Sequence, residues 1–277
     1  MKILSCGAGM QSTALALMSC ENKQKGIVHP LVPVYDAIIF CDLGLEPEWV
    51  KRQAGFIQMA CEKAGIPFYI LTSPLYEDYL KGFGSKRVTS IPFWTVGEDG
   101  KKGKMLRNCT LDYKINLIER FVRYELLGYR PHQRLREVDI KAHEMHIGFS
   151  KEEERRCREN PGRLFINRFP LVEMGVTRAD NYRYILETWG LDTKASACCF
   201  CPFHTNYFFG YIKGHLPEDY KKTVMFDEML EKRQPDTKIK SRLYISRSRK
   251  RITELRPEEC CDMQCFPYKG KEIWNGF

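Results

Sequence analysis

The chain has 277 residues, of which 43% are hydrophobic and 12% aromatic, enough for the core of one large domain or of a domain with an appended module. Its net charge of +9 and pI near 8.9 favour polyanionic partners such as nucleic acid or nucleotides, although a positive surplus also serves solubility. No apolar run approaches the roughly 18 residues that cross a bilayer, and the N-terminal stretch lacks a small-residue cleavage site. We therefore expect a cytoplasmic protein without a membrane partner.

Strand and helix patterns alternate over the N-terminal quarter of the chain. Short apolar strands are predicted at 2–4, 36–40 and 67–71, separated by helices at 12–20 and 47–65. Such alternation is typical of parallel strands joined by crossover helices. We expect an α/β fold with a doubly wound, mostly parallel sheet.

The remaining patterns are less regular. They predict a Gly- and Lys-rich loop at 81–108, helices at 112–127 and 178–190, a strand at 143–149, a charged helical turn at 152–160, a helix near 217–233 and a basic β-like run at 241–255. In the helix at 178–190, the predicted apolar face consists of Tyr182, Ile185, Leu186 and Trp189.

The C-terminal part differs from the rest in its cysteines and its basic run. We expect a nucleotide-binding domain over 1–195 and a small cysteine-containing module over 196–277. The basic stretch Lys238–Arg251, with Tyr244 interleaved, could follow a phosphate backbone. A solvated face or a charge-protected edge strand explains the same residues equally well.

A glycine-rich turn follows the first predicted strand, from Ser5 to Thr13. Backbone amides in such a turn, followed by a helix N-terminus with hydroxyls, form an anion site that suits phosphate. The turn lacks the Gly-Lys-Ser/Thr ending of a Walker A loop. It is not a dinucleotide fingerprint either, because Ser12 stands where the last glycine should be. The alternative is a tight turn without a ligand.

Carboxylates follow the second predicted strand in the segment CDLGLEPEWV. In an open parallel sheet, the carboxyl ends of the strands border the ligand crevice. Asp42 and Glu46 are therefore candidate ligand contacts. The alternative is that Glu46 and Glu48 only interact with the positive end of the following helix.

The chain has twelve cysteines, which in a reducing compartment indicate metal ligands or redox thiols rather than disulfides. Four stand singly and are expected to be ordinary packed side chains: Cys20, Cys41, Cys61 and Cys157. Cys198 and Cys201 form a C-x2-C pair, while Cys109 lies near two cations, Arg107 and Lys114. Two further candidate ligands, Cys261 and Cys265, lie close to the C-terminus.

Taken in order, these motifs resemble the family of PP-loop ATP pyrophosphatases and phosphoadenosine-phosphosulfate-reductase-like proteins. The resemblance is to phage-type relatives and to the ATP-pyrophosphatase component of DNA phosphorothioation systems. The segment GAGMQS is similar to the family's Ser-Gly-Gly-x-Asp-Ser loop. Gly9 and Ser12 match it, whereas Gly7, Ala8 and Gln11 replace the usual serine, glycine and aspartate.

Further segments are similar to the same family. Asp42, Gly44 and Glu46 match an Asp-Thr-Gly-x-Glu stretch in which Leu43 replaces threonine. The segments RNCTLDYKI, GFSKEEERR and PLVEMGVTRAD also match, and PEECCDMQC matches a C-terminal cysteine signature in part.

The resemblance implies an adenine nucleotide alpha-hydrolase-like fold that binds ATP and Mg²⁺. The implied nucleotide contacts are Ser5, Gly7, Ala8, Gly9, Gln11, Ser12, Asp42, Gly44 and Glu46. Ser12, Arg107 and Lys114 are the implied catalytic groups, with Cys265 as the nucleophile if the chemistry is reductive. The implied metal ligands are Cys109, Cys198, Cys201 and either Cys261 or Cys265. They would hold a [4Fe–4S] cluster, with zinc or metal-free redox thiols as alternatives.

The expected reaction is adenylation of an acceptor by ATP, followed by sulfur transfer. The acceptor would be DNA, as in phosphorothioation, or tRNA, and a cysteine desulfurase or another protein would supply sulfur. One alternative is a sulfonucleotide reductase. The other is a non-catalytic nucleotide-binding scaffold of a modification complex.

Overall fold

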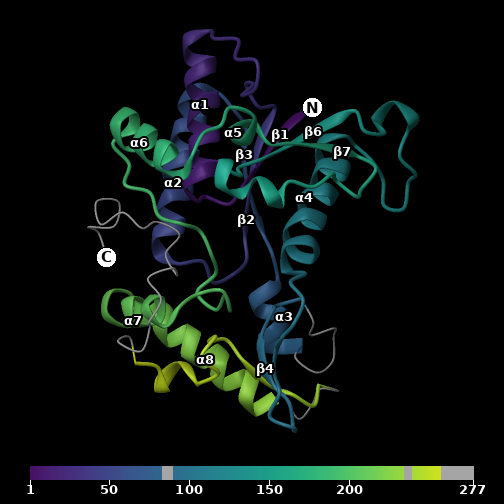
Figure 1. Cartoon of the computed structure of the whole chain (residues 1–277). Coiled ribbons are helices and arrows are strands. Elements are labelled where there is room, and N and C mark those ends of the chain that lie inside the picture. The colour runs from purple at the N-terminus through teal and green to yellow at the C-terminus, as the bar shows by residue number, and fades with distance from the viewer. Residues whose placement is uncertain (83–89, 234–238, 257–277) are drawn as a thin grey trace. The chain divides into compact units, whose positions relative to one another are not determined.

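The computed structural model describes residues 1–82, 90–233 and 239–256 (Figure 1). The chain divides into two compact units that are interleaved in sequence. The first unit consists of Met1–Asp42, Trp49–Thr72 and Asn116–Ser196. The second unit consists of Leu43–Glu48, Ser73–Ile115 and the chain from Ala197 onward. The sequence-based division into 1–195 and 196–277 stays a prediction.

A five-stranded parallel sheet forms the centre of the first unit, which confirms the predicted α/β fold. Its order is β3-β2-β1-β6-β7. The strands are β1 (Lys2–Cys6), β2 (Ala37–Asp42), β3 (Phe68–Thr72), β6 (His143–Ile147) and β7 (Phe165–Arg168). The sequence did not reveal β7, because its four residues, FINR, lack an apolar run.

Helices cross between the strands in two directions. α1 (Met10–Lys25) joins β1 to β2, and α2 (Glu48–Ala64) joins β2 to β3. The chain then passes through α4 (Asn116–Phe121) and enters β6 on the other side of β1. Because such crossovers are right-handed, α1 and α2 cover one face of the sheet and α4 covers the other, as Figure 1 shows. The strand order therefore reverses between β1 and β6.

Apolar residues on both faces of this sheet are buried, as expected for parallel strands. Ile3, Ile39 and Met145 pack with Ile118 and Val122 of the crossover on one face. Leu4, Ile38 and Phe40 on the opposite face are at most 3% exposed.

The predicted helix at 178–190 exists as α6 (Arg178–Trp189), which packs against α1. Ile185 is buried, as predicted. The prediction that Leu186 shares the apolar face is wrong, because Leu186 is 41% exposed. Asn181 is buried instead, since its side-chain amide donates to Thr177 O in the preceding turn. Polar residues that bond locally can thus occupy a face that periodicity assigns to apolar ones.

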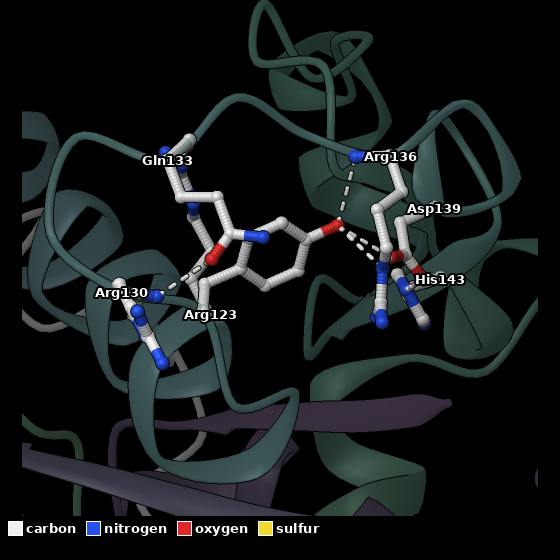
Figure 2. Close-up of polar contacts among 7 residues, drawn as sticks. Arg123, Arg130, Gln133, Arg136, Asp139 and His143 are labelled. Carbon is white, nitrogen blue, oxygen red and sulfur yellow. Dashed lines mark hydrogen bonds and ion pairs between the residues drawn. The ribbon is translucent and has the colours of Figure 1, made fainter.

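A polar network lies at the start of β6 (Figure 2). Asp139 accepts hydrogen bonds from the Tyr129 hydroxyl and from Arg136 Nε, the latter at 2.6 Å. His143 Nε2 lies 3.1 Å from the other Asp139 oxygen. The hydrogen bond from Tyr129, assisted by those from Arg136 and His143, holds the pKa of Asp139 at about 2. This network anchors the loop at 129–139 to the sheet.

The second unit combines helices with a small antiparallel sheet of order β5-β4-β8. Its elements are α3 (Leu75–Gly82), β4 (Trp94–Val96), β5 (Lys102–Lys104), α7 (Asn206–His215), α8 (Pro217–Arg233) and β8 (Arg242–Tyr244). Stacked rings of Tyr76, Phe200 and Phe226 fill its core.

The structure changes two predictions in this unit. The described part of 81–108 is not an uninterrupted loop, because it contains β4 and β5. The basic run at 241–255 is a strand only at β8, followed by a bend and a short 3₁₀ turn, Ile252–Glu254. The helix near 217–233 is confirmed as α8.

Candidate functional site

The glycine-rich turn lies at the carboxyl end of β1, where the strand order reverses. Open α/β sheets bind ligands at this position. Ala8 has a left-handed φ of 49°, and Gly9 caps α1 with φ −96° and ψ 173°. The Ser12 hydroxyl accepts from Gly7 N at 3.2 Å and donates to Gly9 O at 3.2 Å. Gly9 has no side chain to accept from the first-turn amides of α1, so these donors suit an anion.

Close neighbours hold this turn on two sides. A Cβ on Gly9 would lie 2.7 Å from Ser196 Oγ and 3.1 Å from the Ser196 backbone nitrogen. A Cβ on Gly148, just after β6, would lie 2.7 Å from Ser12 N. Both positions therefore require glycine, because larger residues would displace backbone atoms of the turn or of its neighbour. Ser5, which the sequence resemblance implies as a nucleotide contact, lies on β1. It is half-buried and stands opposite Ile147 of β6 in the sheet.

A buried glutamine, Gln53, holds the same turn from α2. Its side-chain amide donates to Ala8 O and, at 3.0 Å, to Lys194 O. The Gln53 amide oxygen accepts from Lys194 N at 2.6 Å. Gln53 was not among the predicted site residues, although a glutamine between the buried Val50 and Ile57 on one helix face was a usable signal.

Gln11 is the residue of the turn for which the sequence resemblance leads one to expect an aspartate. Its amide donates to Glu153 Oε2 at 2.7 Å. Glu153 is 7% exposed and also accepts from Arg156 and, at 2.8 Å, from Arg178. The carboxylate nearest to Gln11 is therefore already paired with two guanidinium groups, and the turn itself carries no acid.

The segment after β2 divides between the two units. Asp42 ends β2 in the first unit. Gly44 and Glu46 belong to the second unit, where Gly44 has a φ of 94° and a Cβ on it would lie 2.9 Å from Tyr76 Cβ. Gly44 is therefore required by its backbone and by its neighbour, whatever its part in ligand binding.

Glu46 lies beside the cysteines of the second unit. It is 1% exposed, and its Oε1 lies 3.9 Å from Lys114 Nζ and 3.9 Å from Cys198 Sγ. Cys198 and Cys201 form a tight turn in which Cys201 N donates to Cys198 O at 2.9 Å. Burial and the nearby Glu46 raise the pKa of Cys198 well above its usual value.

The other candidate ligands and cations lie around this turn. Burial raises the pKa of Cys201 to about 11, with Cys109 adding to the rise and Arg107 opposing it. Cys109 is half-buried, and its backbone amide donates to Ser90 O at 2.8 Å. The structure thus brings Cys109, Cys198 and Cys201 into one region of the second unit.

These thiols match the donor chemistry of an iron–sulfur or zinc site. Within residues 1–82, 90–233 and 239–256, however, no three His, Cys, Asp or Glu side chains are arranged to hold a metal ion. Cys261 and Cys265 lie outside the described residues. The ligand set therefore stays a prediction.

Two neighbouring side chains have packing roles. Cys199 is fully buried, and its amide donates to Leu45 O at 2.9 Å. His204 stacks on Phe208 with ring centroids 3.4 Å apart, and its Nε2 lies 2.8 Å from Cys198 O. Burial lowers the pKa of His204 to about 4, so the ring is neutral at pH 7.

None of the helices in the described part of the chain has the length and apolar character required to cross a membrane. No protein-family model matches the chain, and no curated protein matches it significantly. Among solved structures it is similar to the U34-tRNA thiolase NcsA from Methanococcus maripaludis with its [4Fe-4S] cluster. The sequence identity is 14% and the TM-score 0.38, over 83% of this chain and 71% of that one. A likeness of this strength does not extend to ligands or activity.

Proposed function

We propose that the chain is a PP-loop ATP pyrophosphatase that adenylates a nucleic-acid acceptor for sulfur transfer. The observation that carries the proposal is the turn between β1 and α1. It presents helix N-terminal amides and Ser12 at the point where the strand order reverses, and Gly148 and Ser196 enclose it. Neutral donors in a fixed turn are the groups that a pyrophosphate requires.

In the proposed reaction, an acceptor oxygen attacks the α-phosphorus of ATP. The bond from that phosphorus to the bridging oxygen breaks, and pyrophosphate leaves with the bond electrons. The first-turn amides of α1 and the Ser12 hydroxyl bind the leaving group. Arg107 and Lys114 stay the predicted groups that offset developing charge. Mg²⁺ would be held mainly by the phosphates and by water, because Gln11 supplies no carboxylate.

The cysteines of the second unit are the proposed holders of a [4Fe–4S] cluster. Cys109, Cys198 and Cys201 would be three ligands, with Cys261 or Cys265 as the fourth. When bound, the cluster would position the sulfur that replaces AMP on the acceptor. The buried Glu46 and Lys114 would set the charge around these thiols. A cysteine desulfurase or another donor protein would supply the sulfur.

Product analysis tests the proposal. Protein purified without oxygen is incubated with ATP and Mg²⁺, alone or with tRNA or DNA, and the nucleotides are identified by mass spectrometry. We expect AMP and pyrophosphate, formed slowly alone and faster with the proper nucleic acid. ATP that stays intact, while a phosphosulfate nucleotide is converted to sulfite with a thiol donor, would establish the reductase reading instead.

A further inference from the structure

Basic and aromatic side chains share one face of the small sheet in the second unit. Lys104, Trp94 and Tyr244 are cross-strand partners on β5, β4 and β8, so they lie on the same face. Lys102 and Arg242 flank them on this face, two residues along their strands. Leu243, which points to the opposite face, is fully buried. The outer face is therefore basic and aromatic, whereas the inner face belongs to the core.

Cations lie directly over two of the rings. Lys104 Nζ is 5.3 Å from the centre of the Trp94 ring and 4.8 Å from that of Phe203. Arg247 and Arg249 lie over Trp94 at 5.8 and 5.3 Å. Such spacing is within the range of cation–π attraction. We refer to Trp94, Lys104, Arg107, Phe203, Arg247 and Arg249 as the aromatic–cation patch.

The two rings of this patch differ in access. Trp94 is half-buried, and its Nε1 donates to Pro202 O at 2.6 Å, which fixes the ring. Phe203 is 45% exposed and has Arg107 at 5.5 Å from its centre. Phe203 is therefore a partly exposed ring with two cations beside it, two residues beyond Cys201.

The cations of the patch differ in their partners. Arg249 donates to the backbone oxygens of Thr95, Arg247 and Gly103 at 3.1–3.2 Å. Within the described residues, no ion pair to a carboxylate joins Lys104, Arg107 or Arg247. Cations without a carboxylate partner beside an exposed aromatic ring are the features with which proteins bind single-stranded nucleic acid. Backbone phosphates contact the cations, and unstacked bases stack on the ring.

We propose that the aromatic–cation patch binds an unpaired segment of nucleic acid, with one base stacked on Phe203 and phosphates on Lys104 and Arg247. This inference rests on the proposed function in that it names the form of the acceptor and where it binds. A loop or single strand fits better than a duplex, because the bases of a duplex are already stacked on each other.

A pocket in the first unit provides a matched control. Its volume is about 790 Å³, and it is lined by Arg123, Arg134 and Arg163 together with Glu119 and Glu137. Arg123 Nη2 donates to Gln133 O at 2.8 Å, and its guanidinium lies 5.6 Å from the Tyr129 ring centre. Arg134 and Arg163 are exposed, so their removal deletes two positive charges without touching the patch.

The test measures binding of fluorescent oligonucleotides by anisotropy, without ATP. The probes are an RNA stem–loop, a single-stranded DNA and a blunt duplex DNA, each at several salt concentrations. We expect Phe203→Ala to weaken binding of an unpaired probe about 5- to 150-fold, the range for loss of one base–aromatic stack. Phe203→Tyr should bind like the unmodified protein, because its ring still stacks.

The charge variants separate the patch from net charge. Lys104→Ala with Arg247→Ala should weaken binding and reduce the dependence of log K on log salt, by about 0.7 for each lost phosphate contact. Arg134→Ala with Arg163→Ala should leave both quantities close to those of the unmodified protein. Whether the RNA or the DNA binds more tightly then identifies the kind of acceptor.

Two results would overturn the docking proposal. One is an equal loss of oligonucleotide affinity in the patch and pocket variants, which would mean that binding depends on the net positive charge and not on the patch. The other is binding that Phe203→Ala leaves unchanged, or that is tightest for the duplex. Failure of the proposed function is seen separately, because absent AMP formation together with patch-dependent binding would overturn adenylation and retain the docking site.

Discussion

The turn after β1 and the cysteine turn at 198–201 are both tight loops. They differ in whether their candidate binding groups are already in the chemical state that a ligand would need. The turn after β1 consists of amides and a hydroxyl, fixed by Gln53 and by contacts to Ser196. The cysteine turn carries a buried thiol, Cys198, and a half-buried one, Cys201, whose pKa values burial raises. A phosphate site can thus be preformed from neutral groups. A thiolate site becomes a ligand set only when a metal replaces the protons.

The largest expected effect is at the cysteine turn. Cys198→Ser or Cys201→Ser should abolish bound iron in anaerobically purified protein, because a serine hydroxyl is a poor ligand for a cluster. Iron and acid-labile sulfide are measured directly. Cys157→Ser, which changes a half-buried cysteine outside the group, should retain both. A colourless unmodified protein with one equivalent of zinc would show that the site is a zinc site.

A smaller but clear effect is expected at the turn after β1. Gly9→Ala should weaken ATP binding by about 1–3 kcal/mol, or roughly 5- to 150-fold in Kd, because its Cβ would displace Ser196. Isothermal calorimetry measures the affinity. Gly55→Ala on α2 is the control, since a Cβ there meets no atom within 4 Å. Equal affinity in Gly9→Ala and Gly55→Ala would place the nucleotide elsewhere.

The smallest effect concerns Gln11. Gln11→Asp introduces a carboxylate into the turn but loses the hydrogen bond to Glu153 and adds a like charge near it. We expect a loss of about 1–2 kcal/mol in the free energy of unfolding and no gain in Mg²⁺-dependent ATP affinity. Urea denaturation measures the stability, and Gln58→Asp, which breaks the exposed bond to Glu62, should cost less. Tighter Mg²⁺–ATP binding at unchanged stability would show that a carboxylate at position 11 completes a magnesium site.

Much of the first unit was predictable from the sequence, because its strands and helices have regular patterns. β1, β2, β3 and β6 lie where apolar runs placed them, within a few residues. The candidate anion-binding turn was recognisable because its glycines and hydroxyls are adjacent in the chain.

The rest depended on contacts between distant segments. Gln53 and Ser196 lie far from the turn in sequence, so only the fold reveals that they hold it. The small sheet could not be predicted, because β4, β5 and β8 are too short for a periodic signal. The aromatic–cation patch depends on the pairing of these strands, so it could not be predicted either. The basic run around Tyr244 is visible in the sequence, but its cross-strand partner Trp94 comes from a segment predicted to be a loop.

Exchange of labelled pyrophosphate into ATP tests the central claim most directly. Attack on the α-phosphorus is reversible while the adenylated acceptor stays bound. Labelled pyrophosphate can then replace the unlabelled pyrophosphate and attack the adenylate, so label should enter ATP. We predict that exchange requires Mg²⁺ and the proper nucleic acid, and that it falls in Gly9→Ala while Gly55→Ala retains it. Label that never enters ATP, with ADP and phosphate as the only products, would contradict adenylation by this chain.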